Sequence, residues 1–172
     1  MEIIRPRIRL YAGIFRADGK LLVKRREKDE SYFGDWSLPG GGIEKEFADK
    51  FLDERIIAQE LARKVMKETG IDIAHYIQPM PALYPAILPV NDWAFAIIIG
   101  VVDEFPYKGI FKYVSPVELL ELAQESTRNR LVGGEGKRMH RMCLRMLASR
   151  DSPNYDYRKE AGEMLKEIQR RW

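Results

Sequence analysis

A glycine run and a nearby set of charged residues are the parts of this chain that offer chemistry. Gly40, Gly41 and Gly42 follow a short extended piece, and Glu44 comes two positions later. Successive glycine N–H groups can approach a phosphate closely, although three glycines can equally form the tight turn before a helix. Glu68 lies further along the chain, and carboxylate oxygens are ligands that Mg2+ prefers. These residue types together indicate a phosphate site with a divalent cation.

A long helix is predicted to carry the second half of this chemistry. It begins near Phe47 to Asp49, and Gly70 is a natural C-terminal cap. Its apolar residues recur at helical spacing: Phe47, Phe51, Ala58, Leu61, Ala62, Val65 and Met66. At about 100° per residue, a continuous helix groups four charged side chains on one face, with Glu68 slightly to the side: Asp53, Glu60, Lys64 and Lys67.

Three interpretations of this charged face stay open. In the first, it is a solvated face without a metal, on which Lys64 pairs at i,i+4 spacing with Glu60 and Glu68. In the second, Glu68 and Glu44 hold a magnesium ion with help from Glu60. In the third, Lys64 and Lys67 replace the charge of the metal and bind a phosphate directly, because a protonated lysine has no lone pair for a cation.

The elements that must position these residues predict a mixed α/β domain. Alternating side chains predict a strand over residues 7–15, and a hairpin turn at Asp18-Gly19 leads into a return strand over residues 21–25. Residues 93–102 are almost uniformly apolar, as in a central strand buried on both faces. Residues 71–77 are expected to be extended.

The second half of the chain predicts further helices. The proline-rich residues 78–89 predict a loop with at most short strands, and residues 111–114 predict a strand. A helix follows Ser115-Pro116, and two more are predicted over residues 137–149 and 156–172. We expect one domain over residues 1–150 and a C-terminal helical extension over residues 151–172.

Composition limits the function classes. The 172 residues are 45% hydrophobic and 32% charged, which is typical of a globular protein with a real core. One cysteine and two histidines argue against a disulfide and a zinc site. The net charge of +3 is a weak indication of nucleic-acid binding, which we do not expect, but it suits phosphorylated ligands. The N-terminus resembles no secretory signal and no apolar run could span a bilayer, so we expect a cytoplasmic protein.

Several ordered motifs resemble the Nudix fold over residues 7–148. The resemblance implies an α/β/α sandwich around a mixed β-sheet, to which this chain adds a C-terminal helix. Four stretches carry it: the hairpin Ala12–Phe15 with Leu21–Arg25, the lead-in Gly34–Glu44, the helix end Ala62–Ile71, and the late strand and helix Lys112–Leu120.

The chain departs from the Nudix box, G-x5-E-x7-R-E-U-x-E-E-x-G-U, in length and in charge. Counted from Gly41, the pattern places its arginine at position 55, whereas the arginine before the Glu-Thr-Gly ending is Arg63, eight residues later. This surplus is about two helical turns. A helix extended at its N-terminal end is the simplest account, and a longer loop is the alternative. Lys64 and Lys67 stand where the family has glutamates, and Phe47 replaces the earlier glutamate.

The resemblance implies hydrolysis of the pyrophosphate of a nucleoside diphosphate derivative with Mg2+ or Mn2+. It assigns Glu68, Glu60 and Arg63 to the catalytic machinery, with Arg63 bracing the catalytic loop, and Glu68, Glu44 and Glu60 to the metal. The predicted substrate-binding residues are Gly40, Gly41, Gly42, Arg25, Lys64 and Lys67. The alternative is a non-catalytic Nudix-fold module, without a metal, that senses a nucleotide or a protein partner. A small nucleotide or another phosphorylated molecule is the expected ligand, there is no membrane partner, and a homodimer is one expected assembly.

Overall fold

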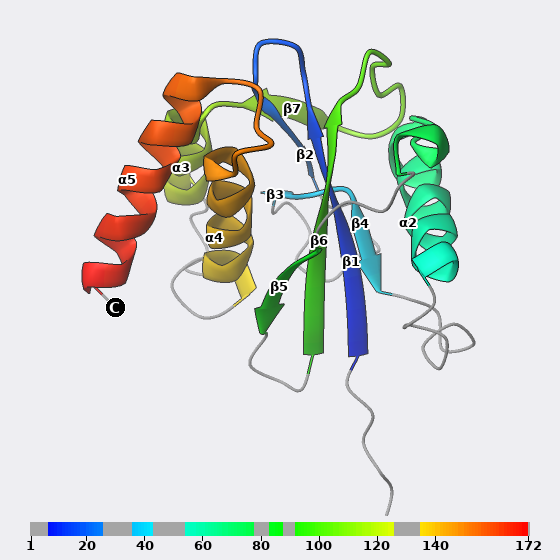
Figure 1. Cartoon of the computed structure of the whole chain (residues 1–172), viewed down its shortest axis with the longest axis horizontal. Coiled ribbons are helices and arrows are strands. Elements are labelled where there is room, and N and C mark those ends of the chain that lie inside the picture. Colours follow the sequence, from blue (N-terminus) through cyan, green and yellow to red (C-terminus); the bar gives the residue numbers. More distant parts are fainter. Residues whose placement is uncertain are drawn as a thin grey trace, which may run out of the picture.

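The computed structural model describes residues 7–25, 36–42, 54–77, 83–87, 92–125 and 135–171. These residues form a seven-stranded sheet between two helical layers (Figure 1). The strands are β1 (Arg7–Phe15), β2 (Leu21–Arg25), β3 (Trp36–Ser37), β4 (Gly40–Gly42), β5 (Leu83–Ile87), β6 (Asp92–Val101) and β7 (Phe111–Val114). The expected α/β/α sandwich around a mixed sheet is therefore confirmed.

The sheet is mixed because one of its pairings is parallel. Its strand order is β3-β2-β1-β6-β5, with β4 also on β1 and β7 also on β2. β1 and β6 run parallel, and the other neighbouring strands run antiparallel. The side chains of β6 alternate between two cores, with Ile97 and Ile99 in one and Ala96 and Ile98 in the other. This strand is buried on both faces, as its uniformly apolar sequence predicts.

Each face of the sheet is covered by a separate set of helices (Figure 1). On one face lies α2 (Glu54–Thr69), which packs its Ile57, Leu61 and Val65 against the sheet. The helices that cover the opposite core are α3 (Pro116–Glu125), α4 (Glu135–Ala148) and α5 (Tyr155–Arg171).

The helix ends follow their local sequence. Ser115 caps α3, since its hydroxyl accepts a hydrogen bond from the Glu118 N–H at 3.2 Å. Gly70 ends α2 with φ +81°, and its N–H bonds to the Met66 carbonyl at 2.9 Å. No helix in the described residues is both long and apolar enough to cross a membrane.

Three local expectations are wrong. Gly40–Gly42 is not a turn but strand β4, because three glycines can also pair along an edge of β1. Residues 71–77 are not extended: a single 3-10 turn, η1 (Ala74–Tyr76), follows α2. Met66 is 37% exposed, so the apolar stripe of α2 passes through Val65 and not through Met66.

Candidate functional site

The site lies where β1 changes neighbours along one edge. Tyr11 pairs with Gly40 of β4, whereas Phe15 pairs with Leu21 of β2. Between these pairs, the Ala12 N–H donates to a carbonyl just before β4. The sheet therefore branches between β2 and β4, and α2 packs against β1 and β4 here.

The backbone conformation at this branch requires a glycine at position 40. Its φ is +131°, in the region that favours glycine. A Cβ atom there would collide with the backbone carbonyl of Leu10 on the paired strand. The absence of a side chain thus lets β4 lie against β1 and leaves the Gly40 N–H directed at α2.

Glu68 reaches this branch from α2 because it continues the apolar stripe of the helix. It lies three residues after Val65, which itself follows Leu61 by one turn. One carboxylate oxygen of Glu68, Oε2, accepts the Gly40 N–H at 2.8 Å. The carboxylate therefore ties the last turn of α2 to β4.

Lys24 meets the other oxygen of the same carboxylate. Its Nζ lies 3.4 Å from Glu68 Oε1. The lysine side chain is only 8% exposed and that of Glu68 only 19%, so the pair is screened less than a surface pair. The branch of the sheet therefore holds a sheltered ion pair.

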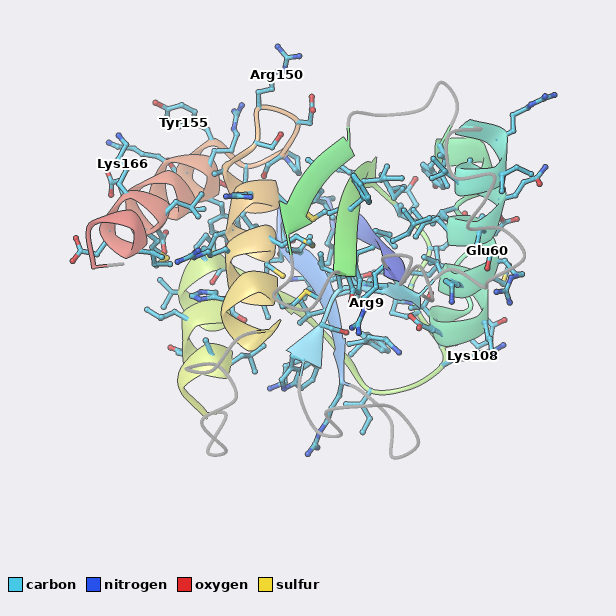
Figure 2. The ribbon with its side chains drawn as sticks, turned by 90° about the horizontal axis from the view of Figure 1, so that it is seen from below. Arg9, Glu60, Lys108, Arg150, Tyr155 and Lys166 are labelled. Atoms are coloured by element: carbon cyan, nitrogen blue, oxygen red, sulfur yellow. The ribbon has the colours of Figure 1, made fainter. Side chains whose placement is uncertain are left out.

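Glu60 lies apart from this pair. Eight residues of helix separate it from Glu68, which is about 12 Å along the axis. The side chain of Glu60 is 4% exposed, and its carboxylate accepts hydrogen bonds from Arg63 Nη2 at 2.6 Å and Nε at 3.2 Å. Figure 2 shows Glu60 on α2, on the side of the molecule opposite Arg150 and Tyr155. Arg63 thus braces α2 internally.

A comparison with protein-family models identifies the family of this chain. The model of the NUDIX domain matches residues 5–123. The chain belongs to the Nudix family of hydrolases. The comparison with curated proteins gave no match.

Solved structures agree with this family. The MutT protein from Methanosarcina mazei Go1 is 25% identical, with a TM-score of 0.50 over 70% of this chain and 85% of that chain. A NUDIX hydrolase from Nitrosomonas europaea has a TM-score of 0.52 at 20% identity, over 88% of this chain and 95% of that chain, and supports the fold alone.

The Nudix box residues divide between the branch and the surface. Lys64 lies one turn before Glu68 and about 40° away around the helix, whereas Lys67 lies about 100° away and is exposed. Of the two lysines, only Lys64 is near the carboxylate face. α2 runs for nine residues ahead of Arg63, and the predicted start of this helix near Phe47 to Asp49 lies outside the described residues, as does Asp53.

Arg25 lies on the opposite face of the sheet from Glu68. Its pairing partner is Trp36, whose side chain packs against the core under α4. Directly paired strand residues share a face, and successive residues alternate. The structure therefore brings Lys24 to Glu68 and directs Arg25 to the other side.

The described residues do not, by themselves, fit the divalent metal that Nudix hydrolases use. No three His, Cys, Asp or Glu side chains gather into a metal-binding group in the described part of the chain. Glu60 is paired with Arg63, and Glu68 with Gly40 and Lys24. Glu44, the third predicted ligand, lies outside the described residues. Among the residues that the structure describes, the branch brings the Glu68 carboxylate beside the Lys24 ammonium group.

The pairing of Lys24 with Glu68 is the feature of this site that our predictions missed. Alternation of polar and apolar side chains could not predict which face of the sheet Lys24 takes, because Leu21, Leu22 and Val23 are all apolar. A usable signal lay elsewhere. Glu68 continues the stripe of Leu61 and Val65, and a carboxylate on a core-facing stripe requires a cation or N–H donors nearby.

Proposed function

We propose that this protein is a Nudix-type hydrolase that cleaves the pyrophosphate of a nucleoside diphosphate derivative. Family membership supports the reaction class. The observation that carries the proposal is the Glu68 carboxylate, which the Gly40 N–H holds at the junction of α2 and the branched sheet. The rest of the box is less acidic than the family pattern, so Glu68 is the residue on which activity depends.

The proposed reaction transfers a phosphoryl group to water. The water oxygen bonds to one phosphorus while the bridging P–O bond breaks, which yields a nucleoside monophosphate and the phosphorylated remainder. In this chain, Gly40 fixes the orientation of Glu68, and Lys64 places a positive charge on the same side of α2. Fixed charges of this kind favour the phosphate charge that develops during the reaction.

A divalent cation, Mg2+ or Mn2+, is part of the proposal. Magnesium commonly takes one or two carboxylates together with water and substrate phosphates. Glu44 would have to join Glu68 to provide two.

The test is a panel of nucleoside diphosphate derivatives incubated with the purified full chain, with and without Mg2+. We expect release of nucleoside monophosphate that needs the cation and falls by at least about 100-fold in Glu68→Gln, the loss typical of one key electrostatic group. Glu118→Gln is the matched control, because Glu118 pairs with Lys20 away from the branch. No release from any derivative by the wild-type chain would refute the proposal.

A second candidate is a Nudix-fold module that binds a phosphorylated ligand without turnover. The observation that favours it is the charge around Glu68: Lys24 lies 3.4 Å away and Lys64 stands where the box has a glutamate. Ammonium groups at these two positions would attract a phosphate and repel a metal ion.

Thermal melts separate the two candidates. A binding module is stabilised by a nucleoside diphosphate derivative equally well with and without a chelator, and the ligand is recovered intact. Stabilisation that needs Mg2+ and is followed by product formation supports the hydrolase instead.

A further inference from the structure

The buried side chain of Lys24 has no part in the proposed hydrolysis. It lies on β2, between Ser37 of β3 and Phe111 of β7 in the pairing of the strands. Neighbours on both sides fix its backbone, and its side chain is 8% exposed. The pairing of the strands therefore fixes the backbone that carries the ammonium group beside Glu68.

We propose that Lys24 is a resident cation of the site that competes with a divalent metal ion for Glu68. This deepens the proposed function and rests on its assignment of Glu68 as the metal ligand. A metal ion bound to Oε1 would lie about 2.1 Å from that oxygen, and Lys24 Nζ lies 3.4 Å from the same atom. The two cations would be no more than about 5.5 Å apart.

Their repulsion in this sheltered place weakens metal binding, since charges at such distances interact strongly where water is largely excluded. The other carboxylate oxygen, Oε2, already shares one of its lone pairs with the Gly40 N–H at 2.8 Å. A metal ion must therefore displace the ammonium group or bind beside it. Either route makes this chain a weak binder of free divalent cations.

The test is direct binding of Mn2+ to the full chain, measured by electron paramagnetic resonance without any nucleotide. Lys24→Gln keeps an amide that can bond to Glu68 but removes the charge. We expect it to bind Mn2+ at least about tenfold more tightly than the wild type. Lys24→Arg keeps the charge and should bind like the wild type.

Two further variants locate the effect. Lys20→Gln removes a lysine from the remote ion pair with Glu118, which is 2.6 Å long, and should leave the Mn2+ affinity within about twofold. In Lys24→Gln/Glu68→Gln, the gain should disappear. Unchanged or weaker Mn2+ binding in Lys24→Gln, or a gain that persists in the double variant, would overturn the inference.

A Lys24→Gln chain that folds poorly still gives an answer. Because a ligand of the folded state stabilises it, Mn2+ should raise the melting temperature of this variant more than that of the wild type, and an equal or smaller rise contradicts the inference. Since no substrate is used, the result is independent of turnover. Tighter Mn2+ binding without hydrolysis would support the inference and count against the hydrolase.

Discussion

Glu68 has a structural role as well as a proposed chemical one. Its substitution by glutamine removes the negative charge beside the Lys24 side chain, which is only 8% exposed. We expect Glu68→Gln to lower the free energy of unfolding by about 2–3 kcal/mol, less than for a fully buried pair, because 19% of the Glu68 side chain is exposed. The double variant Lys24→Met/Glu68→Gln should lose about 1–2 kcal/mol less stability than the sum of the losses of the two single variants. Urea denaturation of all three variants measures this difference.

The exposed pair Lys20 and Glu118 provides the control for this cycle. Its side chains are 24% and 41% exposed, so the same cycle should give a coupling below about 1 kcal/mol. Equal couplings for the two pairs would mean that the branch does not shelter Lys24 and Glu68.

At the residue scale, the sequence indicates Glu68 but not its partner. The Glu-Thr-Gly ending of the box marks Glu68 whatever its surroundings. The contact with Lys24 joins residues 44 positions apart, and it depends on which face of β2 each side chain takes. For Glu60, the sequence predicts the position but not the partner. Its place on the helix suits a shared charged face, but its carboxylate forms an ion pair with Arg63, one turn later.

The first two glycines of β4 differ in how strongly the fold depends on them. Gly40→Ala places a side chain at φ +131° against the Leu10 carbonyl, so we expect a loss of about 2–3 kcal/mol in the free energy of unfolding. At Gly41, with φ +153° and open space around it, the loss should be smaller, about 1 kcal/mol. Chemical denaturation of the two variants checks the order.

Gly162 is the matched control for these glycines. It lies within α5, and a Cβ atom there meets open space. Gly162→Ala should therefore stabilise the chain by about 0.5–1 kcal/mol, because alanine favours a helix over glycine. If Gly40→Ala behaved like Gly162→Ala, β4 would not need its unusual backbone.

At the element scale, side-chain pattern decides what the sequence can predict. β1 and β2 have the predicted bounds, since an alternating strand and a hairpin turn leave little freedom. β4 consists only of glycines, which carry no pattern, and the turn η1 is set by its position after α2. The helix ends at Gly70 and Ser115 were predictable because a cap is a local signal.

Deletion of the C-terminal helix α5 tests the proposed domain boundary between residues 150 and 151. Ala161 of α5 is fully buried, and Leu165 and Ile168 pack against the core under α4. Deletion of residues 151–172 should therefore expose apolar surface, and we expect ANS binding and loss of a cooperative melt. A truncated chain that melts cooperatively within a few degrees of the full chain would make α5 a separable extension.

His140 should make the stability of the whole protein depend on pH. Burial lowers the pKa of this imidazole, and no partner of its Nε2 is present among the described residues. Below the ordinary pKa of about 6.5, the unfolded state takes up a proton that the folded state resists. Stability should therefore fall as the pH drops from about 7 to about 5.5.

Urea denaturation across this pH range checks the direction. His140→Gln should show a shallower fall, because the variant lacks the group whose pKa differs between the two states. An unchanged slope in His140→Gln would assign the pH dependence to other groups.

The parallel pairing of β1 with β6 has a consequence for synthesis of the chain. β1 ends at Phe15 and β6 begins at Asp92, so about 80 residues must leave the ribosome before the two can meet. At roughly 5–20 residues per second, this takes roughly 4–16 s. During that time β1, whose buried residues belong to both cores, has one unpaired edge, and such edges promote aggregation. The rate of translation up to Val101 therefore influences how much of the protein reaches its folded state.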